Sequence, residues 1–414
     1  KMPEEAIFET SKLQLSDLLL DSNRSDLTNL FSITIDGIDT TDRDDAISIE
    51  KLDRIGLESC FRIGIHIADC GSLIPYGGAI DLAASQRMAT LYLPERKIEM
   101  LPKGFSKNLG SLNPEENRVS VSLLVDIDVS GQILDWRVTL SKIQSKVALT
   151  YEDADIALED PTSELHLTIN SLKKIAYKLK QKRERDGAIT IDRAEMIIRV
   201  GSSMKPEVEV LERSTPSRII VSELMILCNS LMAEFCVKEN LPAVYRSQRG
   251  SSFTDGIISP VSDSLRKYLI MRNFAPAELS TKPVPHFGLG LSAYIQATSP
   301  LRRYPDLVMQ RQISHYLNSG RPFYSEDKIE SLIGRAESYL REISRIEEQR
   351  KRYWFLKYLK YSRLNVDKGS DRLTFFNATV LENEFGRLTL FELDEFPYRS
   401  RCKIPQSKAA GEKV

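Results

Sequence analysis

The sequence has few cysteines, and their arrangement predicts neither a metal site nor a disulfide framework. Its five cysteines lie far apart, are odd in number and include no C-x-x-C pair. Cys228 and Cys236 lie in an apolar segment, which predicts buried thiols. The pattern therefore argues against a zinc site and a disulfide-rich secreted protein, and it favours a reducing cytoplasm.

Long hydrophobic runs are also missing. No window of about 18 consecutive apolar residues occurs, so we expect no membrane-spanning helix and no membrane association. The first residues, KMPEEAIFETSKLQL, lack the apolar core of a secretion signal. With 414 residues, 42% of them hydrophobic, the chain fits a soluble globular protein, which we expect to be a monomer. Roughly 100–200 residues per domain predicts several domains.

Net charge is nearly absent, at −1, but the charges are unevenly placed. Acidic residues gather in 36–50, and basic residues gather in 173–185, 301–304 and 349–363. Separate acidic and basic regions are what a metal site beside a channel for a polyanion would need. The position of the charges matters here because electrostatic steering depends on where charge lies and not on the net charge. Taken alone, the basic runs are better explained as solvated helix faces.

Hydrophobic periodicity predicts a chain of mixed helices and strands. Alternation of apolar and polar residues predicts strands at 31–36, 45–52, 61–69, 120–141 (a hairpin) and 189–201. Spacings of three and four predict helices at 79–91, within 151–187, at 222–241, from Pro305 to Leu317, and at 326–363. Gly369 and Ser370 mark a linker, and 373–396 has the pattern of short strands and turns.

The predicted fold class is α+β. We expect an N-terminal lead-in over 1–30, a mixed α/β catalytic domain over 31–365, and a small β module over 370–414.

The densest group of chemically reactive residues is an acidic stretch with the sequence Asp36-Gly-Ile-Asp39-Thr-Thr-Asp42-Arg-Asp44-Asp45. Carboxylates this close repel one another unless they are solvated, protonated or neutralised by a cation. Oxygen ligands without nearby His or Cys favour a hard ion such as Mg²⁺ or Mn²⁺. The EF-hand calcium pattern does not fit this stretch. On these residues alone, a catalytic metal site, a structural cation site and a solvated turn all stay open.

The stretch I-D-G-I-D-T-T-D-R-D-D-A resembles the signature of the RNase II/RNase R (RNB-domain) exoribonuclease family. Asp36, Asp42, Asp44 and Asp45 match its four acidic positions, whereas Asp39 lies outside them. Further matches follow in family order over roughly 31–362, among them HIADCGSLI, Y-L-P, LGSLNPEENR, HFGLGL and TSPLRRYPDL. The resemblance implies that the four acids bind Mg²⁺, with Mn²⁺ as an alternative, and that Asp44 is the most critical for hydrolysis.

Two adjacent arginines, Arg302 and Arg303, precede a predicted helix that has Pro305 near its start. A helix N-terminus flanked by guanidinium groups suits phosphate binding, and arginine can stabilise charge developing on a phosphoryl group. The alternative is two surface arginines that form ion pairs. The resemblance implies that Arg302 is the catalytic arginine and that Arg303 contacts RNA beside it.

The resemblance also assigns an aromatic and an acidic residue to the site. Tyr92 matches the family tyrosine that stacks near the scissile end of the RNA, and Glu348, six residues before Trp354, matches a glutamate near the active site that contacts RNA. Stacking on a ring contributes about 1–3 kcal/mol per base. The alternatives are core packing for Tyr92, and surface pairing with Arg350 or Arg352 for Glu348.

Residues 370–414 resemble the beginning of the family's C-terminal OB-fold, an RNA-binding module that here is partial or divergent. We expect the two N-terminal cold-shock domains usual in the family to be missing here, which would affect RNA capture rather than the chemical step. Gln248 and Gln296 stand where many members have His, as in cyanobacterial or plastid-like members. The expected location is therefore the cytoplasm or the stroma of a plastid-like organelle.

The function predicted is that of a metal-dependent 3′→5′ hydrolytic exoribonuclease, which degrades single-stranded RNA to nucleoside 5′-monophosphates. The polarity is implied by the resemblance. One alternative is a catalytically silent RNA-binding regulator of the same family. Another is a metal-dependent phosphatase that acts on small substrates.

Overall fold

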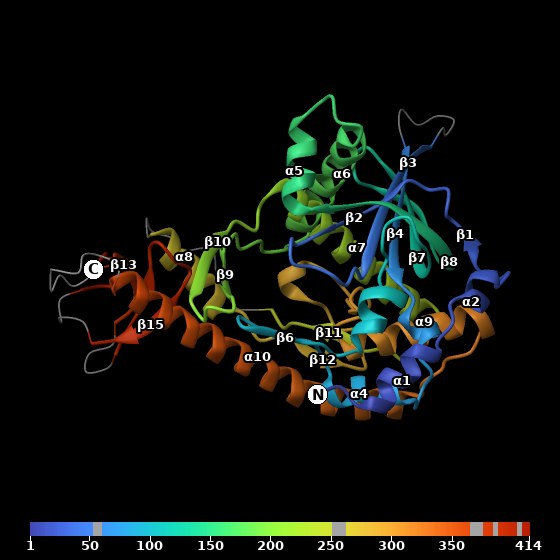
Figure 1. Ribbon diagram of the computed structural model, residues 1–414. Helices are drawn as coiled ribbons and strands as arrows, with labels where there is room; N and C mark the ends of the chain where they lie inside the picture. The colour runs from blue at the N-terminus through green and yellow to red at the C-terminus, as the bar shows by residue number, and fades with distance from the viewer. Residues whose placement is uncertain (53–59, 251–261, 365–375, 384–387, 404–407) are drawn as a thin grey trace.

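The computed structural model describes residues 1–52, 60–250, 262–364, 376–383, 388–403 and 408–414. Its centre is a six-stranded sheet with the order β1-β8-β2-β3-β4-β7. The bounds of these strands are Ser25–Asp26 (β1), Ser32–Asp36 (β2), Asp45–Leu52 (β3), Cys60–Ala68 (β4), Asn117–Asp128 (β7) and Ile133–Thr150 (β8). The long strand β8 pairs antiparallel with β7 and then parallel with β2, so the sheet closes on itself (Figure 1).

Some helices pack on this sheet and others lie beyond it. Their bounds are Glu4–Lys12 (α1), Ser16–Leu20 (α2), Cys70–Leu73 (α3), Ala79–Arg87 (α4), Tyr151–Glu159 (α5), His166–Arg185 (α6), Pro216–Lys238 (α7), Asp263–Arg272 (α8), Tyr304–Ser319 (α9) and Glu326–Leu364 (α10). Short two-stranded ribbons complete the body: Leu91–Leu93 (β5) with Arg96–Ile98 (β6), Glu195–Val200 (β9) with Pro206–Leu211 (β10), and Tyr245–Ser247 (β11) with Glu278–Ser280 (β12). The expected α+β class is therefore confirmed.

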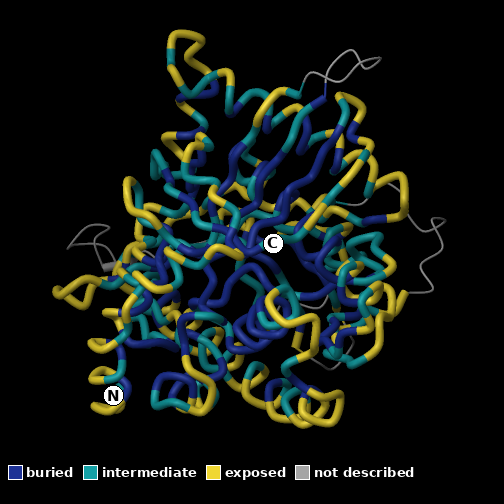
Figure 2. Tube along the Cα trace, turned by 90° about the vertical axis from the view of Figure 1, so that its right-hand side faces the viewer, coloured by how far each residue is buried: buried dark blue, intermediate teal, exposed yellow. Residues whose placement is uncertain are grey.

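The core lies within and against the closed sheet, where the tube of Figure 2 is mostly dark blue. The predicted strands supply its isoleucines, including Ile33, Ile47, Ile63, Ile65 and Ile67, each at most 1% exposed. Buried serines also line the sheet and hydrogen-bond to one another across strands. Both faces of the central strands are thus covered, which is why β4 is buried along most of its length.

Helix α7 is long and apolar enough, by length and composition alone, to cross a membrane. In the structure it packs as a core helix, because half of its most apolar window is buried. Cys228 and Cys236 are both fully buried on it, as the sequence predicted. Glu223 on the same helix is buried and receives two hydrogen bonds from Arg183 of α6. The buried ion pair between Glu223 and Arg183 is consistent with packing of α7 inside the protein.

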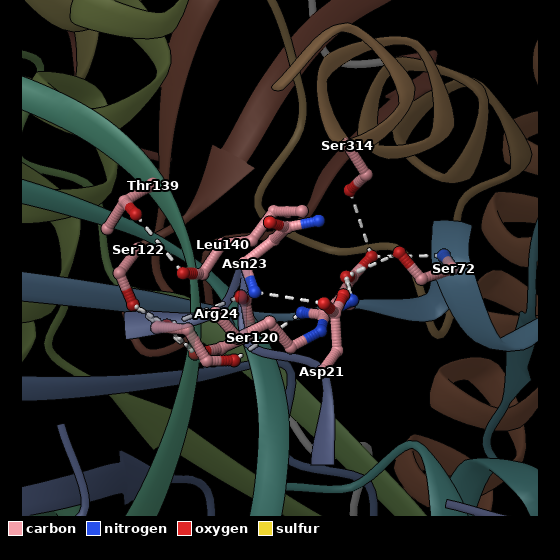
Figure 3. A network of polar contacts seen from close by, with 11 residues as sticks. Asp21, Asn23, Arg24, Ser72, Ser120, Ser122, Thr139, Leu140 and Ser314 are labelled. Atoms are coloured by element: carbon pink, nitrogen blue, oxygen red, sulfur yellow. Dashed lines mark hydrogen bonds and ion pairs between the residues drawn. The ribbon is translucent and has the colours of Figure 1, made fainter. Parts of the chain in front are cut away.

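The expected lead-in over 1–30 does not form a separate segment. Its residues 25–26 form β1, which pairs with β8, and Arg24 is 4% exposed. Arg24 donates to Asp69 over 2.7 Å, and Asp69 also accepts hydrogen bonds from Ser72 and from Ser314 of α9. Figure 3 shows Arg24, Ser72 and Ser314 of this network. A buried ion pair therefore ties the N-terminal segment to the same body as α9.

The helix expected over 79–91 ends earlier than predicted, at Arg87. Met88 follows with a positive φ of 63°, and its carbonyl accepts a hydrogen bond from the N–H of Tyr304. Thr90 then donates its N–H to the carbonyl of Arg302. Backbone hydrogen bonds to the segment 302–304, here called the arginine segment, replace the last helical turn. This is a tertiary contact, which local periodicity does not encode. The strand expected over 189–201 is also shorter, because β9 begins at Glu195.

The C-terminal strands Ala378–Glu382 (β13), Thr389–Leu393 (β14) and Arg399–Cys402 (β15) form an antiparallel sheet in the order β13-β14-β15. This sheet packs on the end of α10. There the centroid of the Phe355 ring lies 4.5 Å from the ring centroid of Tyr398 and 5.2 Å from that of Phe396. Helix α10 thereby joins the main body to the C-terminal strands, at the left of Figure 1. The linker expected at 369–370 lies outside the described residues, and the OB-fold stays a prediction.

Candidate active site

The acidic stretch connects two neighbouring strands of the central sheet. Asp36 is the last residue of β2 and Asp45 is the first of β3, while Asp42 and Asp44 lie in the loop between them. All four carboxylates line one cavity of about 760 Å³. The loop folds back because β2 and β3 pair antiparallel, so both ends of the acidic stretch meet at one edge of the sheet.

Segments distant in sequence complete the walls of this cavity. Tyr92 and Lys97 come from the β5–β6 hairpin, and Arg302 and Arg303 come from the segment before α9. The structure thus brings every predicted site residue except Glu348 to one cavity. Those that line it are Asp36, Asp42, Asp44, Asp45, Tyr92, Arg302 and Arg303.

Burial perturbs the acids of this cavity strongly. It raises the pKa of Asp36 to about 6, although Arg43 opposes the shift. It raises the pKa of Asp44 to about 7 against the opposing charge of Arg302. The pKa of Asp45 lies well above its usual value, because burial and then the charges of Asp36 and Asp44 disfavour ionisation. The cavity therefore favours any positive charge that can lie beside these carboxylates.

Cationic side chains already lie against the acids, among them Arg43, whose Nε lies 4.0 Å from Oδ2 of Asp36. The Nζ of Lys97 donates to both carboxylate oxygens of Asp42, over 2.6 and 2.8 Å. The Nε of Arg302 lies 3.4 Å from Asp44, whose other oxygen accepts a hydrogen bond of 2.9 Å from the N–H of Leu301. The backbone contact joins residues 257 positions apart and fixes the arginine segment beside the acidic loop.

The acids fit a hard divalent cation by donor chemistry and by an unsatisfied oxygen. The Oδ2 of Asp36 is buried and has no hydrogen-bond partner, and oxygen-only donors suit Mg²⁺ or Mn²⁺. Within the described ranges, however, no three Asp, Glu, His or Cys side chains converge as a finished ligand group. Lys97 on Asp42 and Arg302 on Asp44 occupy part of the coordinating capacity instead.

The two arginines differ in their freedom. Arg303 donates to Asp306 over 2.6 Å, and Asp306 also accepts from the N–H of Ser299, so Arg303 is anchored to the first turn of α9. Arg302 donates one Nη2 hydrogen bond to Ser299, and its side chain remains 41% exposed at the cavity. Arg302 is therefore the more exposed of the two arginines at the cavity. The predicted helix from Pro305 to Leu317 is present as α9.

The structure does not bring Glu348 to the cavity. Glu348 is exposed and is not among the lining residues. Its neighbour Glu347 instead accepts a 2.8 Å hydrogen bond from the N–H of Tyr92. The geometry of an α-helix separates the two side chains by about 100°, so only one of them faces the hairpin. The match based on Trp354 alone thus points one residue away from the glutamate that makes this contact.

Lys97 was not anticipated, although the sequence carries a signal for it. The letters LYLPERKI predict a short hairpin with a turn at Pro94 and Glu95, which would pair Tyr92 with Lys97. The two residues are indeed cross-strand partners, and cross-strand partners share a face. The ammonium of Lys97 lies 5.2 Å from the centre of the Tyr92 ring. Asp39, ranked below the other acids, lines the cavity and pairs with Arg199.

The family model of the RNB domain matches residues 24–319 of the chain. The chain belongs to the RNB family. The match begins at the buried Arg24, in agreement with the inclusion of β1 in the central sheet. It covers all of the cavity residues named above and ends at the last residue of α9.

Curated RNB relatives include an uncharacterized ribonuclease of Synechocystis, 33% identical over 84% of this chain and 52% of that protein. Another is the chloroplastic/mitochondrial ribonuclease II of Arabidopsis thaliana, 28% identical over 99% of this chain and 51% of that protein. The chain thus spans about half the length of the curated relatives it matches.

Solved structures share the RNB fold. RNase R of Mycoplasma genitalium, in complex with ribose-methylated single-stranded RNA, matches with a TM-score of 0.84 and 20% identity over 97% of this chain and 67% of that chain. Yeast Ssd1, described as a pseudonuclease, matches with a TM-score of 0.73 and 18% identity over 94% of this chain and 51% of that chain. The fold therefore occurs both in a ribonuclease and in a pseudonuclease, and the site decides between them.

Proposed function

We propose that this RNB chain is the catalytic part of a divalent-metal-dependent exoribonuclease. It shortens single-stranded RNA by hydrolysis from the 3′ end and releases nucleoside 5′-monophosphates. The observation that carries the proposal is the convergence of Asp36, Asp42, Asp44 and Asp45 with Arg302 around one cavity. RNA is the preferred substrate because RNase R of Mycoplasma genitalium, which shares the fold, binds it.

The four aspartates would hold the cation, Mg²⁺ or Mn²⁺, with Lys97 leaving Asp42 as the positive charge is replaced. When bound, such a cation acidifies water and neutralises charge on a phosphoryl group. The oxygen of Asp36 that accepts no hydrogen bond and the raised pKa values of Asp36 and Asp44 support this role, because a cation would stabilise the ionised carboxylates.

Arg302 would stabilise the charge that develops on the phosphoryl oxygens. Its guanidinium lies beside Asp44 at the cavity and keeps part of its surface free, whereas Arg303 is held by Asp306 and would orient the backbone of the RNA. Tyr92, 42% exposed at the cavity, offers a ring on which the end base stacks. Attack of water on phosphorus, with departure of the 3′ oxygen of the shortened chain, gives a 5′-monophosphate.

A catalytically silent RNA-binding role is the main alternative, since the same fold occurs in a pseudonuclease. The complete set of four aspartates with Arg302 argues for catalysis. Degradation of end-labelled RNA with Mg²⁺, set beside hydrolysis of nitrophenyl phosphate, separates the possibilities. Stepwise release of mononucleotides supports the proposal. RNA binding without cleavage indicates the regulator, and cleavage of the small ester alone indicates a phosphatase.

The curated relatives include a chloroplastic/mitochondrial ribonuclease and a ribonuclease of a cyanobacterium. The cytoplasm, or the stroma of a plastid-like organelle, is accordingly the proposed site of action of this chain.

A further inference from the structure

The β5–β6 hairpin carries Tyr92 and Lys97 to the cavity, yet the hairpin itself is only two short strands, Leu91–Leu93 and Arg96–Ile98. A two-stranded ribbon of this length is not stable by itself. Its position must therefore come from what it contacts. On one side Lys97 donates to Asp42 of the acidic loop, and the N–H of Val200 donates to the carbonyl of Pro94 in the turn. The remaining polar contacts of Tyr92 and of the turn are with α10.

Glu95, in the turn of the hairpin, uses its two carboxylate oxygens on two different residues of α10. Oε2 accepts a 2.7 Å hydrogen bond from the indole Nε1 of Trp354. Oε1 accepts from Arg350, with 2.9 Å to its Nε. These charge-assisted bonds fix both the position and the orientation of the carboxylate.

The α10 residues that receive the hairpin lie on one stripe of the helix. Glu347, Arg350 and Trp354 follow the spacing i, i+3, i+7, which places them on the same face. Glu347 accepts the N–H of Tyr92, so the hairpin is held at the middle of β5 and at its turn. Trp354 is 1% exposed and packs with Phe355 in the small core shared with the C-terminal sheet. The anchor at Trp354 is consequently part of a buried core.

We propose that Glu95 is a positioning residue, which holds the Tyr92 ring at the cavity by anchoring the β5–β6 turn to Arg350 and Trp354. This inference rests on the proposed function, because it assigns Tyr92 to the end nucleotide. Glu95 does not line the cavity and touches no acid of the site, so it acts on RNA only through the hairpin.

The test is a double-mutant cycle on the full chain with Tyr92→Ala, Glu95→Ala and the pair. Dissociation constants for a short single-stranded oligoribonucleotide are measured in chelator. Loss of one stacked base corresponds to roughly 5- to 140-fold in affinity, so each single variant is expected to weaken binding at least about tenfold. The double variant is expected to bind no more weakly than Tyr92→Ala alone, because Glu95 acts through Tyr92.

Three controls separate positioning from general damage. Glu95→Gln keeps an acceptor for Trp354 and is expected to restore part of the affinity. Glu342→Gln removes an exposed ion pair with Arg345 on the same helix and is expected to change nothing. In a Trp136→Phe background, Trp354 is the remaining tryptophan, and its emission is expected to shift in Glu95→Ala because the indole loses its partner.

Independent effects that multiply in the double variant would overturn the inference, as would unchanged emission of Trp354. Binding without turnover refutes the proposed function alone, since the cycle is measured without hydrolysis. Normal turnover by the parent chain, together with losses of affinity that multiply in the double variant, refutes only the positioning role of Glu95. Absence of RNA binding by the parent chain refutes both.

Discussion

His66 lies in the centre of the sheet and is predicted to make the protein sensitive to acid. Its ring is fully buried and hydrogen-bonded between Ser48 (3.0 Å to Nε2) and Ser122 (2.7 Å to Nδ1). Burial lowers the pKa of His66 from 6.5 to about 4. Between these values the unfolded chain binds a proton that the folded chain does not, so stability falls as the pH falls.

The size of the effect follows from the two pKa values. Their difference of about 2.5 corresponds to roughly 3 kcal/mol, since each pKa unit is worth about 1.4 kcal/mol. The contribution of His66 is complete above pH 6.5 and is lost progressively as the pH approaches 4. Solvent screening does not reduce this figure, because the side chain is 0% exposed.

The assay compares the parent chain with His66→Gln by urea unfolding at several pH values from neutral to about 4. Carboxylates titrate in both proteins, so the difference between their free energies of unfolding isolates the histidine. That difference is expected to change by roughly 3 kcal/mol across the range, in the direction of a relatively less stable parent at low pH. A difference that stays constant would show that the imidazole titrates alike in folded and unfolded chains, and would refute the reasoning.

Three further outcomes are expected. Arg302→Ala lowers the single-turnover cleavage rate at saturating enzyme far more than RNA affinity, and Arg302→Lys does not restore it, because lysine lacks the planar fork; a hundredfold loss of binding with an unchanged rate would make Arg302 a substrate anchor. Chelator abolishes cleavage while circular dichroism stays unchanged, because the hydrophobic core is formed by apolar side chains and not by the four acids; full activity in chelator would contradict the metal requirement. Arg24→Met lowers the free energy of unfolding by about 3–5 kcal/mol by leaving Asp69 buried without its cation; a loss below about 1 kcal/mol in urea unfolding, which is the size typical of an exposed pair, would contradict this reasoning.

Local patterns predicted the parts of the site that lie within one stretch of chain. The alternation on both sides of the acidic residues predicted β2 and β3, and Pro305 predicted the start of α9. These predictions succeed because the alternation of apolar and polar residues in strands, the residues that begin a helix and a cluster of acidic residues are all properties of a short stretch of chain. The resemblance then assigned Arg302 and Tyr92, which line the same cavity as the acids.

Long-range contacts were beyond the local patterns. The hydrogen bond from Leu301 to Asp44 joins distant segments, and the early end of α4 results from pairing of Met88 with Tyr304. The choice of Glu347 over Glu348 depends on the rotation of α10 relative to the hairpin. Each of these is decided by packing between elements, which residue spacing within one element does not determine.

The most direct test of the account is the activity of Asp44→Asn. Asp44 is 6% exposed, faces Arg302 and lies among the four acids, so its charge belongs to the proposed metal site rather than to the RNA-binding surface. Degradation of end-labelled RNA and filter binding are measured on the same folded preparation. Loss of hydrolysis with RNA binding largely retained is the expected result. Turnover at the parent rate by well-folded Asp44→Asn would contradict the assignment of the active site.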